Sequence, residues 1–572
     1  MSLKLPYGLS TFKEIIHEGY AYIDRTSFIQ TLESTGEKYV YFLRPRRFGK
    51  SLWLSTLHNY YGLEHKSDFH KTFQKLYIGQ HTTSLANNYL VLALDFSQID
   101  TQTNHSTFSG FLRNVKQGVL IFLQTYKDFF PEEQQEQVAK IEDPTSIISH
   151  LITITHKYAP NRKIYLLIDE YDHFANEILA VRSTQFQKIV SQNGWVRKFY
   201  EAIKVGAAKS IIDRIFITGV SPITLDSMTS GFNIASNLTN SYTYHSLMGF
   251  TEQEVRQILK DINVSEDSFQ ETLHDMRKWY NGYKFNEEAE NKLYNPNMVL
   301  YFAKTYIQRK KYPKQLLDPN ITTDTSKLRS LFQNRNQNYR LHLQEILNHK
   351  RKPIYSYLTE MFSLEQDFSR QDFISLLYYM GMLTIVDEQL GAKQFAPPNY
   401  VIEKLYHQYF FQKLLQEAQI PASKFKLHQT FRQIALQNDI PQLAKTMQEL
   451  LALLVNRDSI RFDEKHVKIT LLSLLLHTEI YTVHSEYPLG KQHADIVLIR
   501  KPQYPQIHQF IFELKYVKKT QAHKLPQITK QATEQLQTYT KHPTIKTLTN
   551  LKAWVIILTG LDDITLKEIP VV

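Results

Sequence analysis

Short apolar runs alternate with amphipathic helical patterns over roughly the first 245 residues of the chain. The runs cover residues 39–43, 89–94, 164–168 and 214–218. Strand-like runs separated by helical segments are typical of βαβ units around a parallel sheet. We therefore predict an α/β domain with a parallel sheet over residues 1–250.

The pattern changes twice further along the chain. Residues 251–450 are predicted to be mostly helical, beginning with a capping box in which Thr251 and Glu254 precede Val255 and Ile258. Residues 451–572 instead predict a helix at 466–476, strands at 494–499 and 509–514, a polar helix, and a strand at 553–558. That order indicates a small C-terminal α/β domain.

Composition narrows the classes of protein and of site. No stretch of about 20 apolar residues is present, and the N-terminus lacks the apolar core of a secretory signal, so we expect a cytoplasmic protein without a membrane span. The absence of cysteine excludes disulfides, thiol nucleophiles and cysteine-bound metals. A net charge of +11 fits a nucleic-acid partner, although many ordinary enzymes share such an excess.

A candidate phosphate site follows the first strand-like run. Gly49, Lys50 and Ser51 open an amphipathic helix, as in a P-loop, where backbone N–H groups hold phosphates, a lysine reaches the β and γ phosphates, and a hydroxyl binds Mg²⁺. The first glycine of the usual motif is replaced by Arg44. Lys50 and Ser51 still fit their two roles.

Acidic residues follow the third run, where Asp169 and Glu170 end an apolar strand. We assign Asp169 to magnesium and Glu170 to the catalytic base of ATP hydrolysis. The alternative is that both acids merely end the strand and face solvent. Thr218 or Ser221, at the end of the fourth run, could sense the γ-phosphate or simply close that strand.

These motifs together resemble the AAA-ATPase-like family of bacterial proteins. The resemblance rests on Tyr22-Ile-Asp24-Arg25-Thr26, Arg44-Pro-Arg46-Arg47-Phe-Gly49-Lys50-Ser51, Asp169-Glu-Tyr-Asp172 and Thr218-Gly-Val220. It implies a P-loop NTPase fold, a family in which the first glycine is usually missing, and a nucleotide site that also includes Asp24, Arg46 and Arg47. It extends to segments 279–285 and 294–297, whose chemical role the sequence does not give.

The C-terminal domain contains a second constellation, formed by Asp495, Glu513 and Lys515. Alternation along a strand puts Glu513 and Lys515 on one face, and Asp495 lies beside them if the two runs pair as a hairpin. Two carboxylates then bind Mg²⁺ or Mn²⁺, and the lysine acts on the water that attacks a phosphodiester.

This arrangement resembles the PD-(D/E)XK nucleases over about residues 455–572. The resemblance implies a further acidic ligand, Glu464 with Glu486 as its rival, and a Gln and a Tyr on the next helix, here Gln535 and Tyr539. His493 could approach the metal or the phosphate, but a surface position is the simpler interpretation.

The combined prediction is an ATPase that controls a Mg²⁺-dependent nuclease acting on DNA or RNA, with defence against foreign nucleic acid as its suggested role. The alternative is an ATP-regulated switch whose C-terminal domain binds nucleic acid without cutting it. Because Arg46 and Arg47 could reach a phosphate in a neighbouring subunit, we also expect a homo-oligomer.

Overall fold

The structure is a computed structural model of the chain and describes residues 3–173, 194–222, 233–319, 338–350, 352–362, 369–417, 426–455, 464–560 and 563–571. The chain divides into two compact units. The first comprises Met1–Lys310, Leu316–Asn338 and Ile354–Tyr400, and the second comprises Lys311–Gln315, Tyr339–Pro353 and Val401–Val572. The segment expected to be helical, 251–450, therefore contributes to both units.

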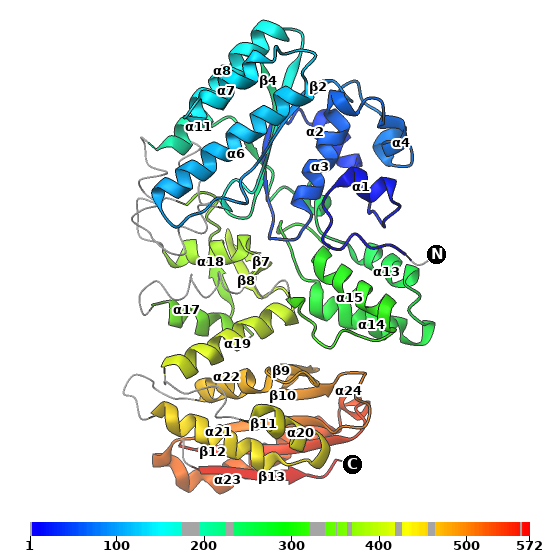
Figure 1. The fold of residues 1–572 in the computed structure, drawn as a ribbon. Helices are drawn as coiled ribbons and strands as arrows, with labels where there is room; N and C mark the ends of the chain where they lie inside the picture. Colours follow the sequence, from blue (N-terminus) through cyan, green and yellow to red (C-terminus); the bar gives the residue numbers. More distant parts are fainter. Residues whose placement is uncertain are drawn as a thin grey trace. The chain divides into compact units, whose positions relative to one another are not determined.

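A five-stranded parallel sheet forms the centre of the first unit, with the strand order β2-β3-β4-β1-β5 (Figure 1). Its strands are β1 (Tyr39–Leu43), β2 (Tyr89–Asp95), β3 (Lys163–Asp169), β4 (Ile212–Gly219) and β5 (Ser236–Asn237). The four predicted strands are thereby confirmed. Strand β4 separates β1 from β3, so the candidate phosphate loop and the candidate acids follow strands that are not neighbours.

Helices cover both faces of this sheet. In Figure 1, α6, α8 and α11 lie on one side, and α1 to α4 lie on the other. Their bounds are α1 (Phe12–His17), α2 (Ser27–Ser34), α3 (Lys50–Tyr61), α4 (Phe69–Phe73), α5 (Tyr77–Gln80), α6 (Asn104–Thr125), α7 (Glu133–Lys140), α8 (Pro144–Tyr158) and α11 (Trp195–Ala208), with the 3₁₀ turn η1 at Leu63–His65. Because both faces are covered, the strand residues are nearly all apolar and buried.

The rest of the first unit is helical with one small antiparallel sheet. The predicted capping box is confirmed, since Thr251 and Glu254 each bond the other's backbone at the start of α13. The elements are η2 (His245–Leu247), α13 (Glu252–Asp261), α14 (Glu266–Tyr280), α15 (Pro296–Arg309), β6 (Ile354–Ser356), α18 (Arg370–Tyr379), β7 (Thr384–Gln389) and β8 (Ala392–Ala396). The sheet, ordered β6-β8-β7, was not predicted, because β7 is exposed over its last four residues and shows no alternation.

The second unit contains a five-stranded sheet of order β13-β12-β11-β10-β9. Its elements are α17 (Asn338–Leu347), α19 (Tyr400–Glu417), α20 (Leu427–Gln437), α21 (Ile440–Val455), α22 (Glu464–Leu475), β9 (Tyr481–Leu489), β10 (Gln492–Arg500), β11 (Gln509–Val517), η5 (Lys519–Lys524), α23 (Leu525–Thr540), α24 (Pro543–Lys546), β12 (Leu551–Thr559) and β13 (Asp563–Ile569). The predicted helix, strands and hairpin are confirmed, with β10 antiparallel to β11. The edge strands β9 and β13 were missed because polar residues fill much of them.

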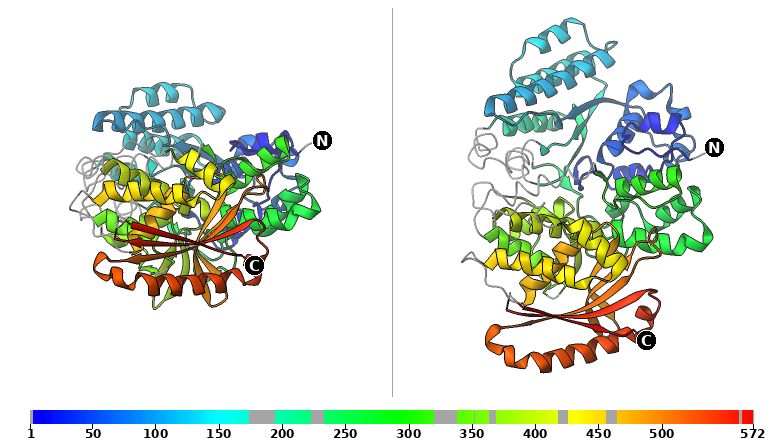
Figure 2. Two further views of the ribbon diagram at one scale, coloured as in Figure 1. Left: turned by 90° about the horizontal axis from the view of Figure 1, so that it is seen from below. Right: turned by 60° about the horizontal axis from the view of Figure 1, so that its bottom comes forward.

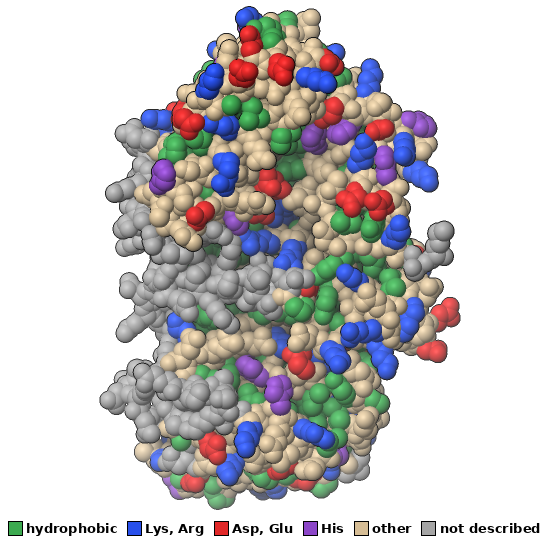
Figure 3. All heavy atoms as spheres, in the orientation of Figure 1, with side chains coloured by type: hydrophobic (Ala, Val, Ile, Leu, Met, Phe, Trp, Pro, Cys, Tyr) green, Lys and Arg blue, Asp and Glu red, His purple; other side chains and the backbone are tan. Residues whose placement is uncertain are grey.

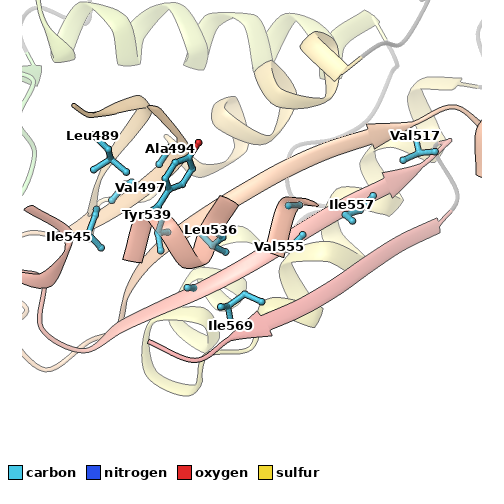
Figure 4. Packing of buried hydrophobic residues seen from close by; sticks show 13 residues of the cluster. Leu489, Ala494, Val497, Val517, Leu536, Tyr539, Ile545, Val555, Ile557 and Ile569 are labelled. Atoms are coloured by element: carbon cyan, nitrogen blue, oxygen red, sulfur yellow. The ribbon is translucent and has the colours of Figure 1, made fainter. Parts of the chain in front are cut away.

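Both faces of this second sheet are also covered. Buried residues of β10, β11 and β12 pack with Leu536 and Tyr539 of α23 in one apolar cluster (Figure 4). The opposite face meets the junction of α20 and α21, where Trp554 Nε1 donates to Asn438 Oδ1 at 3.0 Å. Figure 2 shows α23 lying along the sheet. The fold class is therefore as predicted: a P-loop-type parallel sheet, a helical middle region and a small C-terminal α/β domain.

Two general properties follow from the described residues. None of the described helices combines the length and apolar character needed to cross a bilayer. In the view of Figure 3, Lys and Arg side chains are interspersed with Asp and Glu on the visible surface and do not gather into one basic face. The excess of positive charge is therefore spread out on that face.

Candidate functional site

The loop between β1 and α3 has the backbone geometry of a phosphate-binding turn. Gly49 precedes the helix with a left-handed φ of 97°, and a Cβ built there would meet no atom of the described residues within 4 Å. Arg47 is also left-handed, with φ of 64°. The loop thereby exposes the N-terminus of α3, whose free N–H groups and dipole favour an anion.

Arg44 occupies the place of the missing first glycine and is 1% exposed. Its guanidinium lies between the rings of Phe42 and Phe285, 4.1 and 4.0 Å from their centres. It donates to backbone oxygens of Leu43 (2.9 Å) and Thr239 (2.7 Å), and more weakly to those of residues 244 and 245. Burial lowers the pKa of Arg44 to about 9, which leaves it charged at neutral pH. Arg44 is therefore the internal support of the loop and does not face a ligand.

Lys50 and Ser51 meet the acids at the end of β3. Lys50 Nζ donates to the Arg44 and Pro45 carbonyls, at 3.2 and 3.3 Å, and lies 4.0 Å from Glu170 Oε1. Burial raises the pKa of Asp169 to about 6, aided by the charges of Glu170 and Asp95 and opposed by a hydrogen bond from Ser51 and the charge of Lys50. The four predicted residues Lys50, Ser51, Asp169 and Glu170 are thus brought together.

Glu170 is held in a strained position, with φ of 52° in the left-handed region. Its Oε2 lies 3.4 Å from His173 Nδ1, and that nitrogen is 3.4 Å from an Arg46 nitrogen. Burial tends to raise the pKa of Glu170, but His173, Lys50 and Arg46 together lower it to about 2. The sequence analysis missed His173, which could have been recognised because it lies three residues after Glu170.

A cavity of about 750 Å³ opens beside this loop. Arg46, Arg47, Lys50 and Glu170 line one part, and the remaining lining is largely apolar, from residues 3–9, 21–23 and 247–250, while α13 adds Ile258 and polar side chains. Arg47 also lies 3.8 Å from the buried carboxylate of Asp318. The volume and its division into a charged and an apolar part suit a molecule with a phosphate tail and an apolar ring.

Two predicted residues lie elsewhere. Asp24 is not among the residues that line the cavity, and its carboxylate accepts from the backbone N–H groups of Thr26 and Tyr77, both near 2.8 Å. Thr218 is fully buried at the end of β4, with no hydrogen-bond partner for its hydroxyl among the described residues. The carboxylate of Asp172 instead binds the N–H groups of Val220 and Ser221 and fixes the end of that strand.

The segments whose role the sequence left open support the loop. In segment 279–285, the rings of Tyr283 and Phe285 pack edge-on against Phe48, at 5.0 and 5.6 Å. In segment 294–297, Asn297 donates to Asp318, the carboxylate that faces Arg47. Both segments therefore support the phosphate loop, the first through Phe48 and the second through Asp318.

In the second unit, β10 and β11 bring the predicted nuclease residues together. Asp495 Oδ2 accepts from the Leu514 N–H at 3.0 Å, and Lys515 Nζ lies 2.6 Å from Glu513 Oε1. The other oxygen of Glu513 is buried without a hydrogen-bond partner among the described residues. Burial and the charge of Asp495 raise the pKa of Glu513 to about 7, despite Lys515. Such an under-satisfied carboxylate beside a second one is suited to bind a cation.

A lysine that the sequence analysis missed joins this group. Lys468 of α22 is 5% exposed, and its ammonium lies 2.8 Å from Asp495 Oδ1 and also pairs with Glu486. The register of β9 and β10 places Glu486 opposite Asp495, and Glu486 has a left-handed φ of 52°. Lys468 could have been recognised in the sequence because it lies four residues after the expected acid Glu464, and therefore on the same face of a helix.

The remaining predicted residues of this domain differ in how they lie relative to Asp495 and Glu513. Gln535 Nε2 donates to the Tyr539 hydroxyl at 2.5 Å. Burial raises the pKa of Tyr539, and the charges of Glu513 and Asp495 raise it further, so Tyr539 lies near both carboxylates. Glu464 begins α22, but its side chain lies outside the described residues. His493 is exposed on β10, which fits the surface interpretation.

Comparisons with known proteins agree with both motif sets. Residues 6–229 match the family model of the predicted AAA-ATPases, and residues 462–568 match that of the PD-(D/E)XK nuclease superfamily. The chain thus contains a predicted AAA-ATPase domain and a PD-(D/E)XK nuclease superfamily domain.

Two individual proteins are also similar. An uncharacterized protein from the vnfD 5′ region of Azotobacter chroococcum mcd 1 is 28% identical over 307 residues, covering 53% of this chain and 52% of that protein. The chain therefore spans about half the length of this curated relative. The Walker-type ATPase paby2304 of Pyrococcus abyssi is 12% identical, with a TM-score of 0.41 over 67% of this chain and 96% of that one.

Because Arg44 supports the loop, we predict that even its replacement by lysine lowers the stability of the protein substantially. Arg44→Lys removes the planar stacking and leaves buried carbonyl oxygens without donors, so we expect a loss of about 3 kcal/mol in the free energy of unfolding. Urea titration of the full chain measures it. Arg113→Lys, at an exposed position of α6, is the matched control and should change stability by less than about 0.5 kcal/mol. Equal stability of the two variants would contradict the role of Arg44.

Proposed function

We propose that the first unit binds and hydrolyses ATP and that this controls a Mg²⁺-dependent nuclease in the second unit. The observation that carries the proposal is the convergence of Asp495, Glu513 and Lys515 on two paired strands, in a chain that also has an ordered phosphate loop. The two matched family models support the two activities. Control of one by the other is inferred from their presence in one chain.

The first site fits a magnesium nucleotide. Gly49 leaves space for a phosphate to approach the backbone, and Lys50 already lies at the loop with its ammonium on two carbonyls. Ser51 is near enough to Asp169 to lower the pKa of that carboxyl, and both residues offer oxygen ligands. Bound Mg²⁺ would neutralise charge on the phosphates.

Within that site, each side chain has a separate task. Lys50 and the α3 N-terminus hold the β and γ phosphates. Glu170, kept ionised by its neighbours, orients and deprotonates the attacking water, and His173 and Arg46 hold Glu170 in place. The apolar part of the cavity accommodates the base.

The second site fits a divalent cation because one oxygen of Glu513 is buried and has no hydrogen-bond partner in the described part of the chain, while Asp495 lies on the adjacent strand. The cation would act there as a Lewis acid on the scissile phosphate. Lys515 remains beside it to orient the attacking water and to stabilise the developing charge. Gln535 and Tyr539 support the same face from α23.

A second candidate function is a nucleic-acid-binding switch that does not cut. The observation that favours it is Lys468, whose ammonium already pairs with Asp495 and Glu486, where a metal ion would otherwise supply the positive charge. The two functions differ in whether divalent metal displaces that ammonium. We favour the nuclease because Glu513 and Lys515 have no evident use in a switch.

For the biological role we propose defence against foreign nucleic acid, with DNA or RNA as substrate. Assembly into a homo-oligomer stays a prediction, because Arg46 and Arg47 contact residues of their own chain. Sedimentation of the nucleotide-bound chain over a range of concentrations tests that assembly.

The division of labour at the ATP site predicts two different losses. Lys50→Ala should abolish tight ATP binding, because it removes the main side-chain charge on the phosphates. Glu170→Gln should bind ATP normally but hydrolyse it about a hundredfold more slowly. Calorimetry and phosphate release measure these effects, with the exposed Lys127→Ala as control. Unchanged nucleotide affinity in Lys50→Ala would overturn the assignment.

The nuclease assignment predicts that Glu513→Gln removes metal-dependent cleavage while nucleic-acid binding survives, since the phosphate contacts remain. Lys515→Ala should still bind metal but cleave about a hundredfold more slowly. Cleavage of labelled single- and double-stranded DNA and RNA with Mn²⁺ measures this. Glu534→Gln, at an exposed position of α23, should cut like the parent chain. Parent-like cleavage by Glu513→Gln would rule out this site.

Lys468 gives a prediction about metal affinity. Because its ammonium competes for Asp495, Lys468→Met should tighten Mn²⁺ binding by about tenfold or more. Calorimetric titration measures the affinity, and Lys491→Met removes the same charge from an exposed position as a control. Weaker Mn²⁺ binding by Lys468→Met would show that the lysine does not compete with the metal.

A further inference from the structure

A group of three metal-ligating side chains lies apart from both sites, at the C-terminal end of α3. His58 is in the last turn of that helix, and Glu64 and His65 belong to the 3₁₀ turn η1 that follows. One ligand atom from each of the three lies within 4.8 Å of the other two. Lys50 is eight residues away on the same helix, about 12 Å along its axis.

The geometry converges on one carboxylate oxygen. Glu64 Oε1 lies 2.7 Å from His58 Nε2 and 3.6 Å from His65 Nε2. Ligand atoms around a tetrahedral zinc ion are about 3.4 Å apart. The His65 pair already has that spacing, and the His58 pair needs to open by less than 1 Å. The Nε2 atoms of both histidines thus face Glu64 Oε1, and these three atoms form a set of three possible metal ligands.

Neighbouring residues hold the carboxylate in this position. The Tyr126 hydroxyl donates to Glu64 Oε2 at 2.5 Å, which leaves Oε1 for the histidines. A Cβ at Gly62 would come within 2.7 Å of the His58 carbonyl oxygen and 2.8 Å of both Glu64 carboxylate oxygens, so glycine leaves room for the carboxylate in this position. Metal-ligating carboxylates are commonly oriented by such a second hydrogen bond.

We propose that His58, Glu64 and His65 bind a zinc-class divalent transition-metal ion, with one coordination position open to water. Two imidazoles and a carboxylate favour Zn²⁺ and its transition-metal neighbours over Mg²⁺ and Ca²⁺. The three side chains are 33%, 19% and 23% exposed, so an ion can reach them from solvent. The bound ion links the end of α3 to η1. The proposal is independent of the nuclease and of ATP.

The test uses the full chain with Asp495→Asn and Glu513→Gln, so that the acidic site of the second unit does not contribute. The chelator-treated protein is titrated with Co²⁺, which reports its coordination by visible absorption, and then with Zn²⁺ as competitor. We expect one Co²⁺ per chain, displaced by Zn²⁺, and X-ray absorption at the zinc edge should show two imidazole ligands.

Variants in the same background assign the ligands. His58→Gln and His65→Gln should each weaken binding by more than about a hundredfold, and Tyr126→Phe by about tenfold. Glutamine keeps a hydrogen-bonding group beside Glu64, and circular dichroism verifies that each variant is folded. The exposed His70→Gln should bind like its parent. Parent-like binding by both ligand variants, or no Co²⁺ or Zn²⁺ bound at micromolar concentrations, would overturn the proposal and leave a hydrogen-bonded cluster only.

Discussion

The first unit depends on one buried cation. Arg44 directly follows β1, at the point where a P-loop normally has a glycine, and its guanidinium is enclosed by two aromatic rings and backbone carbonyls instead of a carboxylate. A buried charge is costly unless hydrogen bonds offset its desolvation. The two Nη groups of Arg44 donate to backbone oxygens of residue 43 and of the segment near 239–245, Phe285 covers the guanidinium, and Nε has no partner among the described residues. The replacement of glycine thus couples the phosphate site to the rest of the unit.

Cations also organise the acids of the two candidate sites. Lys50, Arg46 and His173 keep Glu170 ionised in a left-handed conformation, whereas Glu513 beside Asp495 has a raised pKa in spite of Lys515. Burial raises the pKa of both carboxyls; His173, Lys50 and Arg46 more than offset it at Glu170, whereas at Glu513 the charge of Asp495 adds to it and Lys515 and Lys468 offset it only in part. The first environment keeps Glu170 ionised and able to accept a hydrogen bond from water, and the second suits a metal ligand.

Strand positions and motif residues could be predicted from the sequence because they are local. The apolar runs gave four strands of the first sheet, and alternation correctly put Glu513 and Lys515 on one face. The edge strands β9 and β13 were missed because their outward residues are polar. Lys468, His173 and the supporting residues in 279–285 were missed because their roles arise only from contacts across different elements. Asp24 was predicted to bind the nucleotide because of its motif, but its carboxylate oxygens accept hydrogen bonds from backbone N–H groups. These contacts, too, become visible only in the folded chain.

The central claim is that nucleotide at the first site governs phosphodiester cleavage at the second. The most direct measurement is the cleavage rate of DNA and RNA by the parent chain and by Lys50→Ala, each with Mn²⁺ and with or without ATP. The account predicts that the parent cleaves at a rate that changes with ATP and that the variant's rate does not respond. Cleavage that is the same with and without ATP in the parent, or an equal ATP response in Lys50→Ala, would contradict it.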